Sequence, residues 1–540
     1  MPAKRTSHLK PGEELTPNWS ELLHGLTASG TTSAPLYQKI VDRIQEAIEG
    51  NLIAEGSRLP TNRELAKLLA VDRSTALRAY SELRKRGYLE SHVGRGSYAC
   101  RPARESKWQS WQPGFDWQER FSRASHTVSD IFSTESDRYE WNPEVISFAG
   151  GIPSFDNYPT SDFESILNRI LKENRAKELF EYSPAEGHGA LRKQVLEHLE
   201  RSGNSSREEE LLIVSGSQQG IDIVSGVMLD PGDYVALEDP TYLWATCSFK
   251  SRQARCLPVP LDGGGIRLDV LESQLKRYRP KFIYVIPNFQ NPTGLTMPLK
   301  RREELLALAN RYQTPILEDD FVGDLRYEGE RLPSLRALPG GKDLVIHQGT
   351  FSKALCPALR LGWLVAPEKV ISRLILAKRA SNLSTNSLSQ IILAEFLQKG
   401  LMQDHLGSIT QTYRNRRDEM LRSLDREFGA SKESTASDIS WSRPQGGMFI
   451  WLRLPDGYSS RELLRHAMSE NVSFAPGHLC FASQQNTQYL RLCFIQNDVD
   501  SIKDGITRLS KAFKIYETEK REDASRRGKP VFTGGGHTFI

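Results

Sequence analysis

Short buried apolar runs alternate with helical segments through most of the second half of the chain, and this pattern constrains the fold more than any other feature. Such runs, four or five residues long, are typical of strands covered on both faces by helices. The pattern predicts an α/β domain with a mainly parallel sheet over residues 141–515. The runs are Leu211–Val214, Tyr234–Leu237, Phe282–Ile286, Pro315–Glu318, Leu344–His347 and Leu361–Val365.

The remaining segments differ in composition from this domain. At 540 residues the chain exceeds what one hydrophobic core organises, so at least two folding units are expected. We expect a flexible leader over 1–34, a small domain over 35–100, a linker over 101–140 that contains Trp108, Trp111 and Trp117, and a flexible tail over 516–540.

Several classes of protein are excluded by composition. No apolar run is long enough to cross a membrane, and no secretory signal precedes the first helix, so a cytoplasmic protein without a membrane partner is expected. The six cysteines never occur at metal-ligand spacing, and no metal is expected. The net charge of +4 is too small to indicate nucleic-acid binding by itself, so any such signal is local.

Three short helices are predicted in the small domain. Leu36, Ile40, Ile44 and Ile48 give an amphipathic helix that ends at Gly50. A second helix follows Thr61 and Glu64 in capping-box spacing, and Asp72 is placed to cap a third, strongly basic helix. This arrangement fits a helix-turn-helix whose second helix enters the major groove, or a three-helix module with a solvated charged face.

The details favour DNA binding. Two alternating runs flank Gly94-Arg95-Gly96 and predict a β-ribbon with a basic tip. The order Leu59-Pro60-Thr61, Arg63, Val71, Arg73, Gly87-Tyr88-Leu89 and Gly94-Arg95-Gly96 resembles the winged helix of the GntR regulators over about residues 36–99. That resemblance implies contacts to double-stranded operator DNA from Arg63, Arg73, Ser74, Thr75, Gly94 and Arg95.

A lysine and an aspartate in the large domain suggest a cofactor. Lys353 lies among small and hydroxyl residues after a predicted strand, and a lysine near other cations can form a Schiff base with an aldehyde. Asp319 ends another buried run, at the sheet edge where α/β folds bind ligands, and can pair with the pyridine nitrogen of pyridoxal 5′-phosphate. Taken singly, a surface lysine and a helix-capping aspartate remain the simpler alternatives.

Other segments supply matching groups. Ser217 and Gln218 open a helix directly after a strand, where free N–H groups and the helix dipole favour phosphate. Asn291 places an amide at the same sheet edge, and Tyr242 offers a ring that can stack on a cofactor.

In this order the segments resemble the class I aminotransferase domain of the pyridoxal-phosphate fold type I. The resemblance makes Lys353 the Schiff-base lysine, Asp319 the partner of the pyridine nitrogen, Asn291 a donor to the ring 3-oxygen and Tyr242 the stacking ring. It assigns the phosphate to Ser217, Gln218, Ser352 and Arg360, with Tyr182 reaching it from the other subunit, and the substrate to Arg491, which takes the α-carboxylate, and to the Gly151 segment.

One position departs from that pattern. Aminotransferases of this class carry a tyrosine two or three residues after the strand-end aspartate, and here Phe321 and Val322 occupy those places. Neither has a hydroxyl to donate to the ring 3-oxygen, so weak or partial transamination is expected.

A winged helix, a linker and an aminotransferase-like domain in one chain is the layout of the MocR/GabR-like transcriptional regulators. The resemblance implies a homodimeric, pyridoxal-phosphate-dependent DNA-binding regulator that senses an amino compound, or the cofactor itself, through a Schiff base. The alternative is an active aminotransferase that carries an accessory DNA-binding domain. The basic third helix and the missing tyrosine favour the regulator.

Overall fold

The computed structural model describes residues 19–23, 35–50, 52–92, 96–101, 116–131, 144–173, 175–429, 438–483 and 486–527. The chain divides into two compact units, Met1–Trp117 and Gln118–Ile540.

The first unit contains the three expected helices and a small antiparallel sheet. Thr61 and Glu64 form the capping box, with Thr61 N donating to Glu64 Oε2 at 2.7 Å, whereas Asp72 precedes its helix without a capping hydrogen bond from its side chain. Ala70 takes a left-handed conformation with φ of +52°, which turns the chain between the two helices. The elements are α2 (Leu36–Glu49), α3 (Asn62–Leu69), α4 (Arg73–Lys85) and the strands β1 (Arg58–Leu59), β3 (Gly96–Ala99) and β2 (Leu89–His92), in that sheet order.

The expected leader is partly structured. Trp19–Leu22 form the short helix α1, and Leu23 is buried in the core of the small domain together with Ile44 and Leu83. The expectation of a flexible leader over 1–34 is therefore wrong for these residues, because their apolar side chains complete that core. Gly94 and Arg95, at the expected basic tip, lie outside the described residues.

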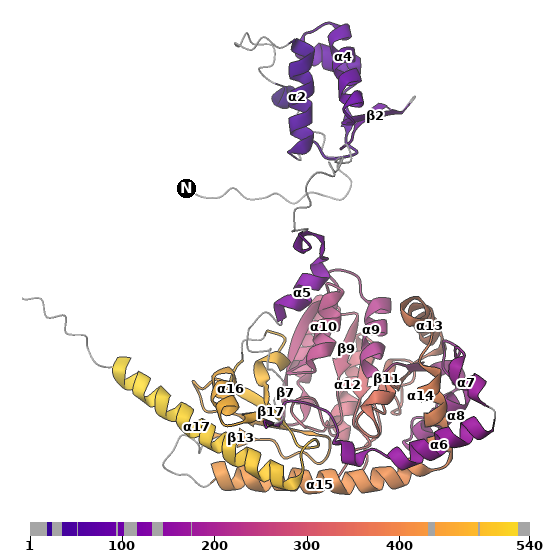
Figure 1. Ribbon diagram of the computed structural model, residues 1–540, viewed down its shortest axis with the longest axis vertical. Helices are drawn as coiled ribbons and strands as arrows, with labels where there is room; N and C mark the ends of the chain where they lie inside the picture. The colour runs from indigo at the N-terminus through magenta and orange to yellow at the C-terminus, as the bar shows by residue number, and fades with distance from the viewer. Residues whose placement is uncertain are drawn as a thin grey trace, which may run out of the picture. The chain divides into compact units, whose positions relative to one another are not determined.

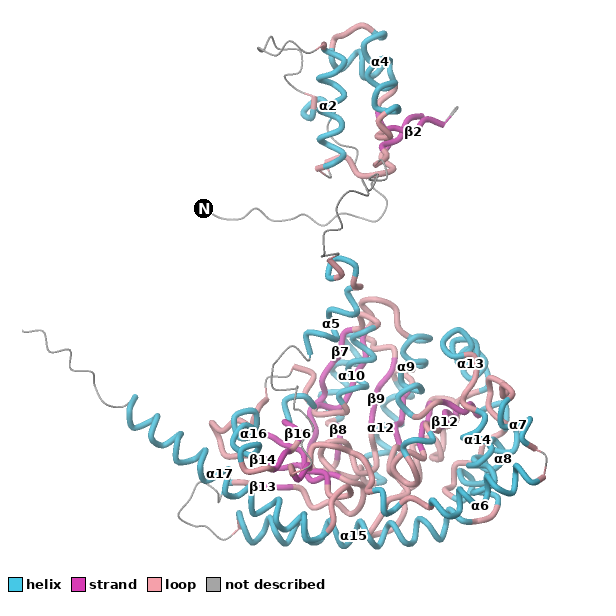
Figure 2. The backbone as a smooth tube through the Cα atoms, viewed as in Figure 1, coloured by secondary structure: helices cyan, strands magenta, loops and turns pink. Residues whose placement is uncertain are grey.

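A mixed sheet of eight strands forms the centre of the second unit (Figure 2). Alternate residues along one strand face different helices. Ile283 and Val285 pack in the cluster with α11 (Leu268–Tyr278) and α12 (Leu299–Arg311), and Tyr284 packs in the cluster with α9 (Ser217–Met228) and α10 (Leu243–Ser251). The sheet order is β5 (Leu211–Val214), β12 (Gly362–Val365), β11 (Val345–Thr350), β10 (Ile316–Asp320), β9 (Phe282–Val285), β6 (Tyr234–Asp239), β7 (Arg255–Asp262) and β8 (Gly265–Ile266), with β12 and β8 antiparallel to their neighbours.

Helices cover both faces of this sheet, as Figure 1 shows. The alternating runs thus gave the α/β class correctly. The covering and flanking helices are α6 (Thr160–Lys172), α7 (Ala176–Phe180), α8 (Gly189–Arg201), α9 (Ser217–Met228), α10 (Leu243–Ser251), α11 (Leu268–Tyr278), α12 (Leu299–Arg311), α13 (Glu368–Asn382) and α14 (Ser387–Gln398).

A smaller α/β region follows. The long helix α15 (Leu401–Phe428) packs against α17 (Val499–Arg527), and a four-stranded sheet joins the same core (Figure 1). The strand order is β13 (Ser440–Trp441), β14 (Phe449–Arg453), β17 (Tyr489–Cys493) and β16 (Ala475–Pro476); α16 (Ser460–Ser469) lies beside α17, and β15 (Val472–Ser473) pairs with β4 (Ile146–Ser147).

Two expected boundaries differ from the structure. The helix α5 (Arg123–Ile131) lies inside the expected linker and packs on α10, with Ile131 buried. Helix α17 continues to Arg527, and Tyr516 is buried against Tyr458, so the tail expected to be loose from residue 516 is helical over its first part. Of the three expected linker tryptophans, only Trp117 lies among the described residues.

Candidate cofactor and ligand site

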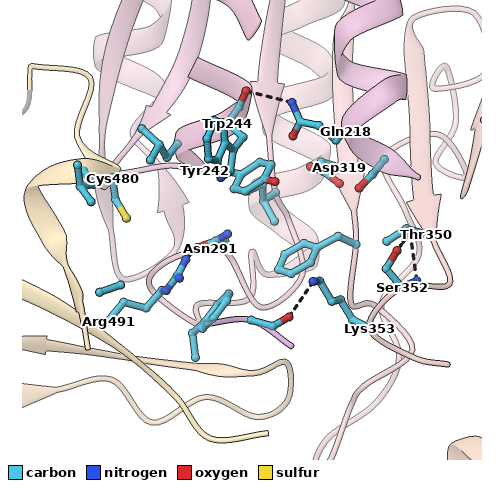
Figure 3. Close-up of a pocket in the computed structure, with 18 of the residues that line it drawn as sticks. Gln218, Tyr242, Trp244, Asn291, Asp319, Thr350, Ser352, Lys353, Cys480 and Arg491 are labelled. Carbon is cyan, nitrogen blue, oxygen red and sulfur yellow. Dashed lines mark hydrogen bonds between the residues drawn. The ribbon is translucent and has the colours of Figure 1, made fainter. Parts of the chain in front are cut away.

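A cavity of about 300 Å³ lies at the edge of the central sheet where β10 and β11 end. Figure 3 shows its polar side chains. Nearly all the site residues expected from the sequence line it: Gly151, Ser217, Gln218, Tyr242, Asn291, Asp319, Ser352, Lys353, Arg360 and Arg491. Tyr182 does not belong to the lining.

Lys353 lies three residues beyond β11, and its Nζ donates to the carbonyl oxygen of Gly151 at 2.7 Å (Figure 3). Burial lowers the pKa of Lys353, and the nearby cations Arg360 and Arg491 act in the same direction. A larger share of this amine is therefore neutral near pH 7 than for an ordinary lysine. The neutral amine is the form that attacks an aldehyde.

Asp319 lies near the end of β10, and only one of its two carboxylate oxygens accepts a hydrogen bond from a described residue. Its Oδ2 accepts a hydrogen bond of 2.7 Å from Tyr284, while its buried Oδ1 has no hydrogen-bond partner among the described residues. Burial raises the pKa of Asp319 to about 6. A buried carboxylate oxygen without a partner is costly, so this site suits a positively charged N–H such as a protonated pyridine nitrogen.

An anion cradle lies at the N-terminus of α9. Gly216 has φ of +84° just before that helix, and a Cβ there would lie 2.7 Å from Nη2 of Arg360. Arg360 Nη1 reaches Ser352 Oγ at 3.5 Å. The first N–H groups of the helix, the guanidinium and the hydroxyl together match a phosphate.

Gln218 can contribute to this cradle through its main chain but not through its side-chain amide nitrogen. Its Nε2 donates to Ser248 Oγ at 3.0 Å and to the carbonyl oxygen of Trp244 at 3.3 Å, the contact drawn in Figure 3. The side-chain amide nitrogen is thus used within the protein. Only the main-chain N–H of Gln218, in the first turn of α9, is left for an anion.

Arg491 and Asn291 meet on the other side of the cavity. Arg491 Nη1 donates to Asn291 Oδ1 at 2.9 Å and Nη2 donates to the carbonyl oxygen of Ala149 at 2.9 Å, while the guanidinium lies 4.1 Å from the centre of the Phe449 ring. The buried Nε has no partner among the described residues. Because Asn291 Oδ1 is an acceptor here, its Nδ2 is the group that can donate to a ligand.

The two residues in place of the usual tyrosine have different surroundings. Phe321 lines the cavity, whereas Val322 is buried in the main core and lies outside the cavity lining. Of these two positions, 321 is therefore the one whose side chain can meet a ligand in the cavity.

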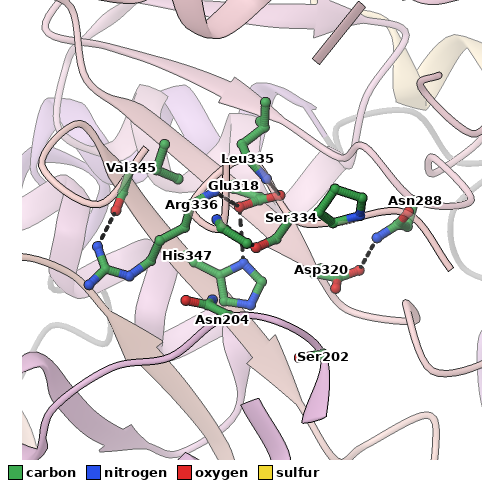
Figure 4. A network of polar contacts seen from close by, with 12 residues as sticks. Ser202, Asn204, Asn288, Glu318, Asp320, Ser334, Leu335, Arg336, Val345 and His347 are labelled. Carbon is green, nitrogen blue, oxygen red and sulfur yellow. Dashed lines mark hydrogen bonds and ion pairs between the residues drawn. The ribbon is translucent and has the colours of Figure 1, made fainter. Parts of the chain in front are cut away.

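A buried polar network supports the strand that carries Asp319 (Figure 4). Glu318 accepts from the main-chain N–H groups of Leu335 and Arg336 and lies 3.1 Å from His347 Nδ1. Burial raises the pKa of Glu318, but the hydrogen bond and charge of His347, together with the Leu335 N–H and the charge of Arg302, hold that pKa below its usual value. The ionised pair ties β10 to β11 and so fixes Asp319 relative to the strand that leads to Lys353.

Tyr284 was not among the candidate residues found from the sequence. It is the one polar residue in the apolar run Phe282–Ile286, and parallel pairing puts Tyr284 opposite Leu317, two residues before Asp319 on the same face. A single polar residue in an apolar run was the sequence signal by which Tyr284 could have been identified. The strand order, which sequence alone does not give, was needed to connect it with Asp319.

The fold and this cavity define an aminotransferase-type domain of pyridoxal-phosphate fold type I, joined to a winged helix. Comparison with known proteins agrees. The profile of class I and II aminotransferases matches residues 143–508, and that of the bacterial regulatory proteins of the GntR family matches residues 36–98.

Individual relatives cover one or both units. The 2-aminoadipate transaminase of Thermus thermophilus is 38% identical over 74% of this chain and 97% of its own length. A crystal structure of the α-aminoadipate aminotransferase LysN from the same species, complexed with a phosphopyridoxyl-leucine, has a TM-score of 0.67 at 37% identity and covers 74% of this chain and 98% of its own. The probable rhizopine catabolism regulatory protein MocR of Rhizobium meliloti is 27% identical over 90% of this chain and 95% of its own length.

The chain belongs to the class I and II aminotransferase family and combines that domain with a GntR-type DNA-binding domain. It is a MocR-type, pyridoxal 5′-phosphate-dependent DNA-binding transcriptional regulator. Over the described ranges, no helix is both long and apolar enough to span a membrane, and no group of three metal-binding side chains occurs.

Proposed function

We propose that the aminotransferase-type domain is a receptor for a small amino compound with a carboxylate, and that its occupancy changes how the protein binds DNA. The observation that carries this proposal is Arg491. Its two Nη groups are held by Asn291 and Ala149, and its buried Nε is without a partner among the described residues, in the cavity that Lys353 also lines. An oriented guanidinium suits the carboxylate of an amino acid.

The other site residues have proposed roles toward the cofactor. Pyridoxal phosphate supplies an aldehyde that takes up an amino group and a ring that withdraws electrons. Lys353 offers the neutral amine for covalent attachment, Asp319 holds the positive charge at the ring nitrogen, Asn291 donates to the ring 3-oxygen and Tyr242 stacks on the ring. Ser217, Ser352 and Arg360 bind the phosphate with the main chain of Gln218, and Gly151 holds Lys353 through its carbonyl oxygen.

We propose a homodimer in the cytoplasm, where the operator DNA lies. Tyr182 supports the dimer, because its side chain is 85% exposed and does not line the cavity of its own subunit. Phe180 and Phe155 are also largely exposed apolar side chains. A second subunit would cover them and receive Tyr182 at its phosphate cradle.

The lack of a hydroxyl at Phe321 and Val322 supports slow turnover. Because one hydrogen bond to the ring 3-oxygen is missing, the domain binds an amine and releases it more readily than it completes transamination. An active aminotransferase with an accessory DNA-binding domain is the alternative, and the 38% identity to a transaminase over nearly the whole of that protein favours it.

One set of titrations separates these functions. Candidate amino acids and amines are added to the holoprotein while the visible spectrum and the affinity for its upstream DNA are followed in the same samples. We expect a ligand that changes both, and at least a tenfold weaker response in Arg491→Gln, which keeps the cofactor. The matched control is Arg453→Gln on the neighbouring strand β14, whose side chain pairs with Asp456 outside the cavity.

Two results would contradict the receptor proposal. One is rapid turnover of an amino donor and a keto acid with no change in DNA affinity, which would establish the enzyme alternative. The other is a response to the ligand that Arg491→Gln leaves unchanged.

A further inference from the structure

The exposed face of α4 carries an apolar side chain between two arginines. Helix α4 buries Ala76, Ala79, Tyr80 and Leu83 in the core of the small domain. Arg73, Leu77 and Arg84 are exposed and are spaced so that, at about 100° per residue, they lie within about 40° of one another on one side of the helix, next to the buried face. Leu77 is 57% exposed.

Among the described residues, Leu77 does not pack in the core of its own domain. It belongs neither to the buried core of this unit nor to the partly buried apolar residues that pack against that core, within the described part of the chain. A single exposed leucine on a surface is ordinary. Its position on the second helix of a helix-turn-helix is what gives it meaning, because that helix enters the major groove.

Other basic residues of the domain are already engaged within it. The Arg78 guanidinium lies 4.1 Å from the centre of the Tyr37 ring, and Arg86 pairs with Asp42 and Glu82. These contacts draw both cations toward α2 and the end of α4. Arg84 is likewise engaged, because its Nη2 donates to Ser91 Oγ on β2 at 2.7 Å. Arg73 and Leu77 are exposed, lie one turn apart in the first half of α4, and so occupy the part of a recognition helix that contacts base edges, with Arg73 available for a phosphate or a guanine edge.

We propose that Leu77 reads a thymine in the operator through its C5 methyl group. In the major groove, the thymine methyl is the one apolar group that base edges present, and an aliphatic side chain is its natural partner. A leucine forms no hydrogen bond to any base, so it disfavours the polar edges of cytosine and guanine at that position by leaving them without water. Leu77 is thus a specificity-determining residue of the winged helix.

The test removes only the methyl group. Preferred duplexes are first selected from a random-sequence pool with the full-length holoprotein, and each thymine of a selected duplex is then replaced singly by uracil. One thymine per half-site should lose about three- to fivefold in affinity on replacement, as burial of one methyl group predicts. Leu77→Ala should bind the thymine and uracil duplexes equally, and Leu77→Gln, of similar length, should do the same.

The matched control is Leu52→Ala. Leu52 is 68% exposed in the same unit but lies outside the helix-turn-helix, so this variant should keep the native preference for thymine. The proposal is overturned if no single uracil lowers the affinity of the native protein, or if the alanine and glutamine variants retain the native discrimination. It is also overturned if Leu77→Ala, with an unchanged circular dichroism spectrum, loses the same factor on every duplex.

Discussion

The hydroxyl of Tyr284 donates a 2.7 Å hydrogen bond to Oδ2 of Asp319, between two neighbouring strands of the sheet. Both side chains are buried, so this bond fixes the carboxylate, and Oδ1 is left without a hydrogen-bond partner among the described residues. The same bond lowers the pKa of Asp319, against the effect of burial, which raises it. Tyr284 therefore helps keep Asp319 ionised for the ring nitrogen of the cofactor.

Tyr284→Phe should weaken cofactor binding. A hydrogen bond to a charged group contributes about 1.5–3 kcal/mol, so the dissociation constant for pyridoxal phosphate should rise by about one to two decades. The loss should be larger at pH 6 than at pH 8, because the pKa of Asp319 rises further without the bond. Equilibrium titration of the apoprotein at both pH values measures this, with Tyr327→Phe as control, a buried tyrosine whose hydroxyl donates to the Gly447 carbonyl. Equal affinities for Tyr284→Phe and native protein would contradict this role.

Asp319→Asn should stabilise the apoprotein in a pH-dependent way. Burial raises the pKa of Asp319 to about 6, from about 3.9 in an unfolded chain, so the native state loses stability as the pH rises from about 4 to 6. An amide avoids this loss, by up to about 3 kcal/mol above pH 7, and the difference should vanish near pH 4. Denaturant unfolding at several pH values checks it. Adding pyridoxal phosphate should stabilise the native protein but not the variant. If it stabilises both equally, the assignment of Asp319 to the cofactor site is wrong.

The groups of the cavity were predictable from sequence where a strand end and its following loop define the position of a side chain. Lys353, Asp319 and Asn291 follow buried runs, and parallel strands deliver such residues to one edge of a sheet. The bond from Tyr284 was not predictable, because it depends on which strands are neighbours. The side-chain direction of Gln218 depends on α10, which is distant in the sequence.

The boundaries were harder to predict for a related reason. Tyr516 follows a helical pattern that becomes mostly charged, so its segment resembled a loose tail, yet the ring packs on Tyr458 and its hydroxyl donates to Glu462. The α5 segment is only nine residues long, too short to be a stable helix by itself, and its order comes from packing on α10. In both places tertiary contacts outweigh local preference.

Lys353→Ala should abolish covalent attachment of the cofactor while leaving the fold intact. The native protein should absorb in the visible range, and borohydride reduction followed by peptide mapping should place the pyridoxyl group on Lys353. Lys378, also buried, donates to the Ala185 and Ile213 carbonyl oxygens and is the natural internal control, since no label is expected there. A pyridoxyl group on another lysine would refute the assignment.

Arg73→Ala should weaken DNA binding without changing the visible spectrum. If the arginine contacts a base, the loss should be about 1–3 kcal/mol and confined to some sequences; if it meets only phosphate, the loss should be smaller and the salt dependence shallower. Binding measured at several salt concentrations distinguishes the two. The same comparison applies to Arg63→Ala on α3. Simultaneous loss of colour and of DNA binding would indicate a folding defect instead of a lost contact.

Phe321→Tyr should increase the rate of the half-reaction with the cognate amine. Phe321 lines the cavity, whereas Val322 is buried in the core, so position 321 is the one where a new hydroxyl can reach the ring 3-oxygen. A hydrogen bond to that charged oxygen is worth about 1.5–3 kcal/mol, or one to two decades in rate. Single-turnover spectroscopy measures the rate, with Phe449→Tyr as control, because it adds a hydroxyl to the same cavity beside Arg491. If the native protein already turns over at ordinary enzyme rates, roughly 1–1,000 per second, the missing hydroxyl does not limit the chemistry and the enzyme alternative replaces the receptor.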